Sequence, residues 1–197
     1  MTDVAPKFAY RVSGAENLDD IRPLWEKLRA HYAPLLSRFG HETPPFIFEP
    51  RKQEILGKAA PGKIRIELVS IVPEAVDIAY CVSTVSPGGR GEIDSMFVEE
   101  RCRGRGIGSE LVRHALAWME SAEASSKVVT IAYPSEDVLA FYRRFGFHHR
   151  AILLQQIYEP TIARRFSAPQ RRAPTRLRPN KRWQPTKAAG RATKTRR

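Results

Sequence analysis

The sequence is poor in cysteine and has neither a long apolar run nor a secretory leader. Its two cysteines, Cys81 and Cys102, cannot build a disulfide framework, and free thiols are typical of a reducing compartment. No apolar stretch approaches the roughly 18 residues of a membrane-spanning helix. Residues 1–10 lack the charged start and apolar segment of a secretory signal. These absences predict a cytoplasmic protein without a membrane span.

Acidic residues are also missing from residues 160–197, which contain 13 Lys+Arg and five prolines. The whole chain has 33 Lys+Arg and 21 Asp+Glu, a formal net charge of +12. Removing the 13 bases leaves 20 bases and all 21 acids in residues 1–159, a net charge of −1. Since the basic segment has too little apolar content to fold alone, we predict one domain over residues 1–159 and a disordered basic tail over residues 160–197.

Two common kinds of catalytic pattern are absent as well. No Gly-x-Ser-x-Gly motif occurs, so the sequence does not support a serine hydrolase. The adjacent His148 and His149 have no third ligand at a suitable spacing, so the sequence predicts no metal site.

Hydrophobic periodicity predicts alternating blocks of helices and strands. Apolar residues recur at helical spacing in four segments and at a spacing of two in the strand segments. The resulting order, strand-helix-helix-strand-strand-strand-helix-strand-helix-strand, combines an antiparallel meander with strand–helix–strand crossovers. We therefore expect an α/β (α+β) fold, a mixed and mostly antiparallel sheet flanked by helices. The expected strands are 8–12, 64–68, 76–85, 92–98, 128–132 and 148–158, and the helices are 17–32, 51–59, 109–119 and 135–145.

A segment rich in glycine and arginine lies between the expected strand 92–98 and the next helix. Glycines let the backbone approach a ligand closely, and the helix start adds unpaired N–H groups and partial positive charge, so the segment predicts a phosphate or pyrophosphate site. No Lys-Ser/Thr pair closes the glycine run, which excludes a P-loop, and Leu111 replaces the third glycine of the dinucleotide fingerprint. The residues concerned are Arg101, Arg103, Gly104, Arg105, Gly106 and Gly108.

Two short motifs resemble the signatures of the GCN5-related N-acetyltransferase (GNAT) superfamily. Arg103-Gly-Arg-Gly-Ile-Gly108 is similar to its Arg/Gln-x-x-Gly-x-Gly/Ala signature, and Ala140-Phe-Tyr-Arg-Arg-Phe-Gly-Phe147 is similar to its Phe-Tyr-x-x-x-Gly-Phe signature. The resemblance spans roughly residues 8–158 and leaves out the tail. It implies a GNAT-like fold and transfer of the acetyl group of acetyl-CoA to a primary amine, by direct attack in a ternary complex and without a metal.

The resemblance also implies how acetyl-CoA is held. Backbone N–H groups of the glycine segment would bind the pyrophosphate, and part of the preceding strand would pair with the pantetheine arm as an added strand. Ser135 stands where the family often has Asn, and its hydroxyl can replace the amide. The implied cofactor-binding residues are Met96, Phe97, Val98, Arg103, Gly104, Arg105, Gly106, Ile107, Gly108, Ser109, Ser135 and Tyr142.

Acetyl transfer needs a proton for the departing thiolate and a neutral amine. By resemblance Tyr142 is the general acid, while its helical spacing with Val138 and Phe145 is also typical of a core tyrosine. Glu92 matches the glutamate base of the histone-type members, and Asp94, two residues on along a strand, shares its face as a substitute base or amine anchor. A remote base acting through water, or no dedicated base, stays open. Two carboxylates would also favour a cationic acceptor.

The acceptor amine is not named by any motif, and a small molecule or a protein amine both fit. Residues 160–197 predict nonspecific nucleic-acid binding, or else a solvated tail without a partner. The alternative function is therefore a catalytically incidental GNAT-like body that the tail tethers to nucleic acid or ribosomes. Self-acetylation of the tail lysines is a third possibility. The expected assembly is a monomer or a homodimer.

Overall fold

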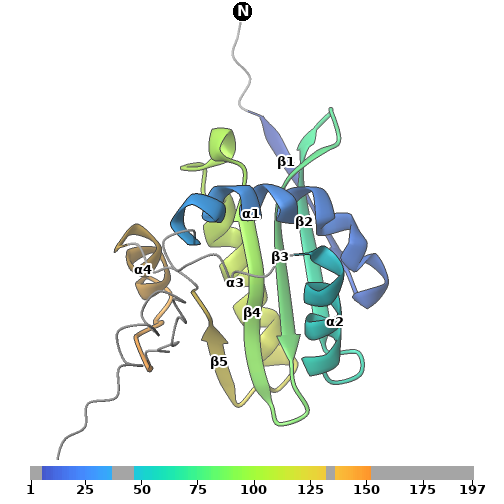
Figure 1. The fold of residues 1–197 in the computed structure, drawn as a ribbon, viewed down its shortest axis with the longest axis vertical. Helices are drawn as coiled ribbons and strands as arrows, with labels where there is room; N and C mark the ends of the chain where they lie inside the picture. Colours follow the sequence, from blue (N-terminus) through green and yellow to red (C-terminus); the bar gives the residue numbers. More distant parts are fainter. Residues whose placement is uncertain (1–5, 37–46, 132–135, 152–197) are drawn as a thin grey trace, which may run out of the picture. The chain divides into compact units, whose positions relative to one another are not determined.

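Five strands form one mixed sheet in the order β1-β2-β3-β4-β5 (Figure 1). The computed structural model describes residues 6–36, 47–131 and 136–151. β1 to β4 pair as an antiparallel meander, and β5 joins β4 in parallel. The predicted mixed, mostly antiparallel sheet is confirmed. The strands are β1 (Lys7–Ser13), β2 (Ile64–Val72), β3 (Val76–Val85), β4 (Arg90–Val98) and β5 (Ser126–Val129).

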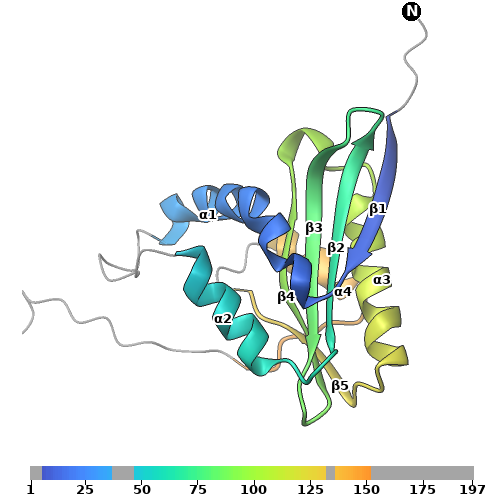
Figure 2. The ribbon, with the colours of Figure 1, turned by 90° about the vertical axis from the view of Figure 1, so that its right-hand side faces the viewer.

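Helices cover both faces of this sheet (Figure 2). α1 and α2 lie against one face and α3 against the other, so the central strands β2 to β4 are largely buried between two helical layers, whereas β1 is mostly exposed. No helix in the described ranges is long and apolar enough to cross a bilayer. The helices are η1 (Ala15–Ile21), α1 (Arg22–Leu36), α2 (Phe48–Lys58), η3 (Glu100–Cys102), α3 (Ile107–Ser121) and α4 (Glu136–Arg143).

The core is divided by the sheet into two apolar clusters. Alternation along β2 sends Ile66 and Leu68 to the α1/α2 side and Val69 to the α3 side. On α3, the buried residues Leu111, Val112, Ala115 and Met119 follow helical spacing and form the stripe that the sequence predicts. These contacts fix α3, and with it the loop that precedes it, against β3 and β4.

Several predicted boundaries differ from the structure. α2 begins at Phe48 instead of residue 51, because Pro50 is tolerated in the first helical turn, where no N–H is needed. β5 covers 126–129 instead of 128–132, because its pairing with β4 begins at Ser126. In the expected strand 148–158, residues 148–151 form no strand and residues 152–158 lie outside the described ranges. The tail and the boundary at residue 159 also lie outside them.

Candidate functional site

A β-bulge on β4 determines which side chains face the α1/α2 side of the sheet. Val82 of β3 pairs with Ser95, but the next residue, Ser83, pairs with Ile93, so Asp94 is an extra residue on β4. As a consequence, Asp94 and Ser95 both face the α1/α2 side. Ser95 bonds there with the buried Tyr80 hydroxyl at 2.7 Å.

Beyond the bulge, β4 separates from β5. The two strands pair only between residues 90–93 of β4 and residues 126–129 of β5. Figure 1 shows β5 diverging from the rest of β4. Met96, Phe97 and Val98 therefore lie on a segment of β4 whose second edge has no strand partner in the described ranges. An extended ligand with amide groups could pair with such an edge.

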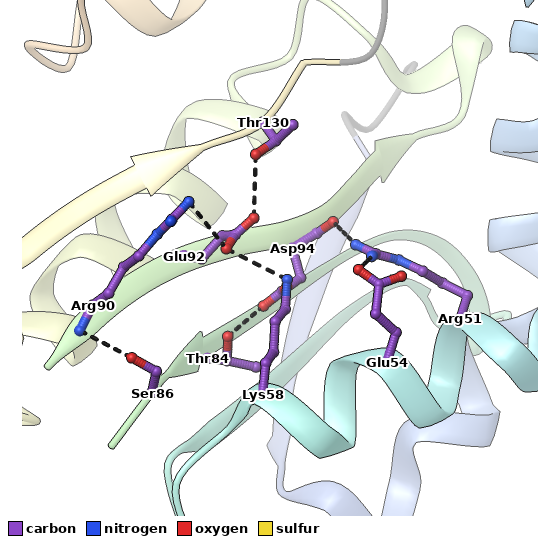
Figure 3. A network of polar contacts seen from close by, with 9 residues as sticks. All are labelled: Arg51, Glu54, Lys58, Thr84, Ser86, Arg90, Glu92, Asp94 and Thr130. Atoms are coloured by element: carbon purple, nitrogen blue, oxygen red, sulfur yellow. Dashed lines mark hydrogen bonds and ion pairs between the residues drawn. The ribbon is translucent and has the colours of Figure 1, made fainter. Parts of the chain in front are cut away.

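Glu92 and Asp94 lie together on the α1/α2 face, as strand alternation predicts. Both carboxylates contact the Lys58 ammonium, which is 3.4 Å from Glu92 Oε2 and also pairs with Asp94 Oδ1 (Figure 3). Asp94 Oδ2 accepts a hydrogen bond from Thr84 Oγ1 at 2.6 Å. Burial raises the pKa of Asp94, although the hydrogen bonds from Lys58 and Thr84 oppose the shift.

Glu92 is the more accessible of the two carboxylates. Its side chain is 15% exposed, whereas that of Asp94 is fully buried. Thr130 Oγ1 donates to Glu92 Oε1 at 3.3 Å, and Arg90 Nη2 lies 3.7 Å from Oε2. The geometry therefore leaves Glu92 better placed to meet a ligand, while Asp94 is held beneath Lys58.

Tyr142 of α4 is buried in the core. It packs edge-on against Phe141 and Phe147, with ring centroids 5.0 and 5.6 Å away, and belongs to the α3-side core cluster. Burial raises the pKa of its phenol, with smaller contributions from Cys81 of β3 and Tyr32 of α1. The two sequence interpretations, core tyrosine and proton donor, are thus compatible.

The glycine segment forms a loop that carries exposed backbone N–H groups. Gly104 and Gly106 have φ of +75° and +85°, and an added Cβ at either would meet no atom within 4 Å. Gly106 caps α3. The N–H groups of residues 104–109 have no acceptor in the described part of the chain, whereas that of Glu110 begins the helical pattern by bonding Gly106 O. Loop and helix start together offer an anion site.

The three arginines of this loop differ in the contacts that they make. Arg103 Nε donates to Val98 O at 3.1 Å, which fastens the loop to the end of β4. Arg101 pairs with Glu99 at 2.8 Å, and Glu99 also contacts Lys27 of α1. Arg105 is exposed, with no interaction among the described residues. Arg105 is therefore the arginine freest to meet an anion.

The remaining predicted site residues fall around this loop or outside the described ranges. Ile107, Gly108 and Ser109 form the first turn of α3, and an added Cβ at Gly108 would contact Phe141 of α4 at 3.5 Å. Ser135 lies outside the described residues.

Sequence reasoning missed the cations of α2. Arg51 Nη2 donates to Asp94 O at 2.7 Å, and Lys58 bridges the carboxylates. These residues are seven apart, a spacing that places both on one side of a helix and could have indicated a shared target.

Comparisons with known proteins agree with this arrangement. The sequence pattern of a family described as "Acetyltransferase (GNAT) family" matches residues 16–147, more than half of the chain. None of the curated proteins matches. Among solved structures, a Bacillus halodurans protein has a TM-score of 0.57 at 14% identity, covering 75% of this chain and 98% of that one.

Two further structures are similar at the level of the fold. A putative acetyl transferase from Pyrococcus furiosus has a TM-score of 0.55 at 17% identity, covering 75% of this chain and 99% of that one. An aminoglycoside N-acetyltransferase in complex with CoA has a TM-score of 0.53 at 14% identity, covering 79% and 99% of the two chains.

Proposed function

The chain belongs to the GNAT acetyltransferase family, and from this membership we propose that it transfers the acetyl group of acetyl-CoA to a primary amine by direct attack. The observation that carries the proposal is the open edge of β4 beside the free N–H groups of residues 104–109. Such an arrangement suits a ligand that joins an amide-containing arm to a pyrophosphate.

Residues 104–109 would bind the pyrophosphate through backbone N–H groups, with the side chains of Arg103 and Arg105 adding charge. Met96, Phe97 and Val98 would pair with the pantetheine arm along the open edge of β4. The loop fits a phosphate because residues 103–106 are exposed and the positions of Gly104 and Gly106 are free of nearby side chains. Ser135 and Tyr142 complete the proposed cofactor contacts.

Glu92 would accept a proton from the acceptor amine, and Tyr142 would donate one to the departing thiolate. The amine nitrogen forms a bond to the carbonyl carbon of the thioester, and the carbon–sulfur bond breaks. Because burial raises its pKa, Tyr142 stays protonated at neutral pH and can act as donor. Because the side chain of Asp94 is fully buried, we propose that it holds the Lys58 ammonium next to Glu92.

The structure changes what the carboxylate pair implies for the acceptor. The pair is already matched by Lys58, with Arg90 next to Glu92. These cations offset the charge of the pair, which weakens the electrostatic argument that two carboxylates favour a cationic acceptor. We propose a primary amine as acceptor and leave its remaining charge to experiment.

The test is release of free CoA from acetyl-CoA in the presence of a panel of amines, including polyamines, aminoglycosides, amino acids and lysine peptides. We expect release above the amine-free control for at least one class, and CoA binding by calorimetry. Neither release nor CoA binding would contradict the proposal. CoA binding without release would point to an acceptor outside the panel, which a wider set of protein N-termini and lysine peptides then tests.

A further inference from the structure

The proposed base and its neighbour share one cation that comes from another element. Lys58 is the last residue of α2, and its ammonium reaches across to β4 to contact both Glu92 and Asp94 (Figure 3). Its side chain is 28% exposed and those of Glu92 and Asp94 are less so. The lysine thus bridges the two carboxylates from the solvent side.

The other groups around the pair interact with only one carboxylate each. Thr84 of β3 donates to Asp94, while Arg90 and Thr130 contact Glu92. Arg51 of α2 is close by, but it bonds the carbonyl oxygen of Asp94 and pairs with Glu54. Within the described ranges, Lys58 is therefore the one cation in contact with both carboxylates.

Two neighbouring carboxylates repel each other, and together they tend to retain a proton unless a cation offsets their charge. Asp94 is especially sensitive because it has lost its contact with water. Burial already raises its pKa in the presence of Lys58, and the charge of Glu92 acts in the same direction. Without the ammonium, the pair would take up a proton at higher pH.

We propose that Lys58 is a positioning residue that keeps Glu92 and Asp94 ionised together and so leaves Glu92 able to accept a proton. The second part of this inference rests on the proposed acetyl transfer. The first part concerns only the protonation of the pair and can be tested whether or not the protein turns over any amine.

The direct test is a carboxyl-carbon NMR titration of Glu92 and Asp94 in the full chain. In Lys58→Met we expect the protonation midpoint of the pair to rise by about one to two pH units, the usual effect of losing an adjacent opposite charge. Lys58→Arg, which retains the positive charge, should keep the midpoint close to that of the wild type. Lys58→Gln, which keeps a hydrogen-bond donor without the charge, replaces the methionine variant if that variant does not fold.

Arg51→Met is the matched control. It removes an α2 cation that anchors to the same strand without touching either carboxylate. If Lys58 only stabilised the structure, Lys58→Met and Arg51→Met would have the same effect on the protonation midpoint of the pair. Unchanged midpoints in the neutral Lys58 variants, or equal shifts in Arg51→Met, would overturn the proposal.

The kinetic test follows the acid limb of kcat/KM against pH. In Lys58→Met this limb should shift to higher pH together with the NMR midpoint, and in Lys58→Arg it should stay near the wild-type position. If the NMR midpoint shifts but the acid limb does not, Lys58 still keeps the pair ionised, but Glu92 is not the base. Absence of turnover in the wild type would instead refute the proposed function and leave the NMR result to decide on Lys58.

Discussion

Tyr142 shows how one side chain can pack in the core and still be available for chemistry. Its ring lies between Phe141 and Phe147, so the position of the phenol is set by packing. Its hydroxyl has no hydrogen-bond partner among the described residues, which leaves the proton free to be donated to a ligand. Since burial keeps the phenol neutral, the proposed acid is in the protonated state at neutral pH.

Tyr142→Phe should therefore lower kcat while leaving the fold and CoA affinity nearly intact. We expect a loss on the order of 100-fold, as for other general acids, because the aromatic ring is retained and only the proton donor is removed. Steady-state kinetics with the best acceptor and CoA calorimetry measure the two effects. A variant with wild-type kcat would show that another group protonates the thiolate.

Individual residues were predictable from the sequence where a regular period governs them. Glu92 and Asp94 share a face, as expected for two residues in a strand, and both contact Lys58. Lys58 itself was missed because a lysine near a helix end is ordinarily solvated, and its helical spacing from Arg51 was the one signal of a shared target. The catalytic roles of Tyr142, Glu92 and Asp94 stay predictions.

At the scale of elements, the loop before α3 depends on a backbone conformation that few residues adopt. Gly106 caps the helix in the left-handed region, and the N–H groups of residues 104–109 around it have no acceptor in the described part of the chain. A side chain at this position meets no steric obstacle from neighbours, so any cost of substitution comes from the backbone itself.

Gly106→Ala should destabilise the protein by about 1–2 kcal/mol and weaken CoA binding. Gly57→Ala is the matched control, because Gly57 lies in α2 with ordinary φ and open space around it. The control should stabilise the helix by roughly 0.5–1 kcal/mol. Urea unfolding and CoA calorimetry on both variants measure these effects. Equal stability of the two variants would argue against a strained loop.

The element order was predictable, but the register between elements was not. Alternating and helical periods predicted β3, β4 and α3 close to their observed limits, whereas the strand predicted over 64–68 continues to Val72 as β2. The bulge at Asp94 arises from pairing with β3, so its position depends on a partner strand that no local pattern specifies. The limits of β5 likewise depend on its pairing with β4.

On the scale of the whole molecule, the described core is built from residues that all precede the basic tail. The apolar clusters run from Phe8 to Phe147, and the family match ends at residue 147. Residues 160–197 supply charge but little apolar surface. We therefore expect the body to keep its structure without them.

Deleting residues 160–197 should leave the melting temperature and CoA binding close to those of the full chain. Retention on a polyanion such as heparin should be lost, because the remaining residues have a net charge of −1. Thermal unfolding and a salt series on the polyanion measure the two effects. Retention of the truncated protein at low salt would place the binding surface on the body.

The distribution of charge along the sequence predicts a near-neutral body and a basic tail. Composition alone does not identify what the tail binds. Nucleic-acid binding, a cytoplasmic location and the monomer or homodimer stay predictions. The family match and the fold are confirmed for the body. Its acceptor could not be predicted, because no motif specifies it.

The short pairing of β4 with β5 leaves part of the sheet edge for a bound ligand to stabilise. Only four residues of β5 are joined to β4, so a ligand lying along the open edge would add main-chain bonds that the protein alone does not form. Binding to the native state alone stabilises a protein in proportion to the logarithm of ligand concentration. With acetyl-CoA bound as proposed, the free energy of unfolding would then rise with the concentration of acetyl-CoA, independently of any turnover.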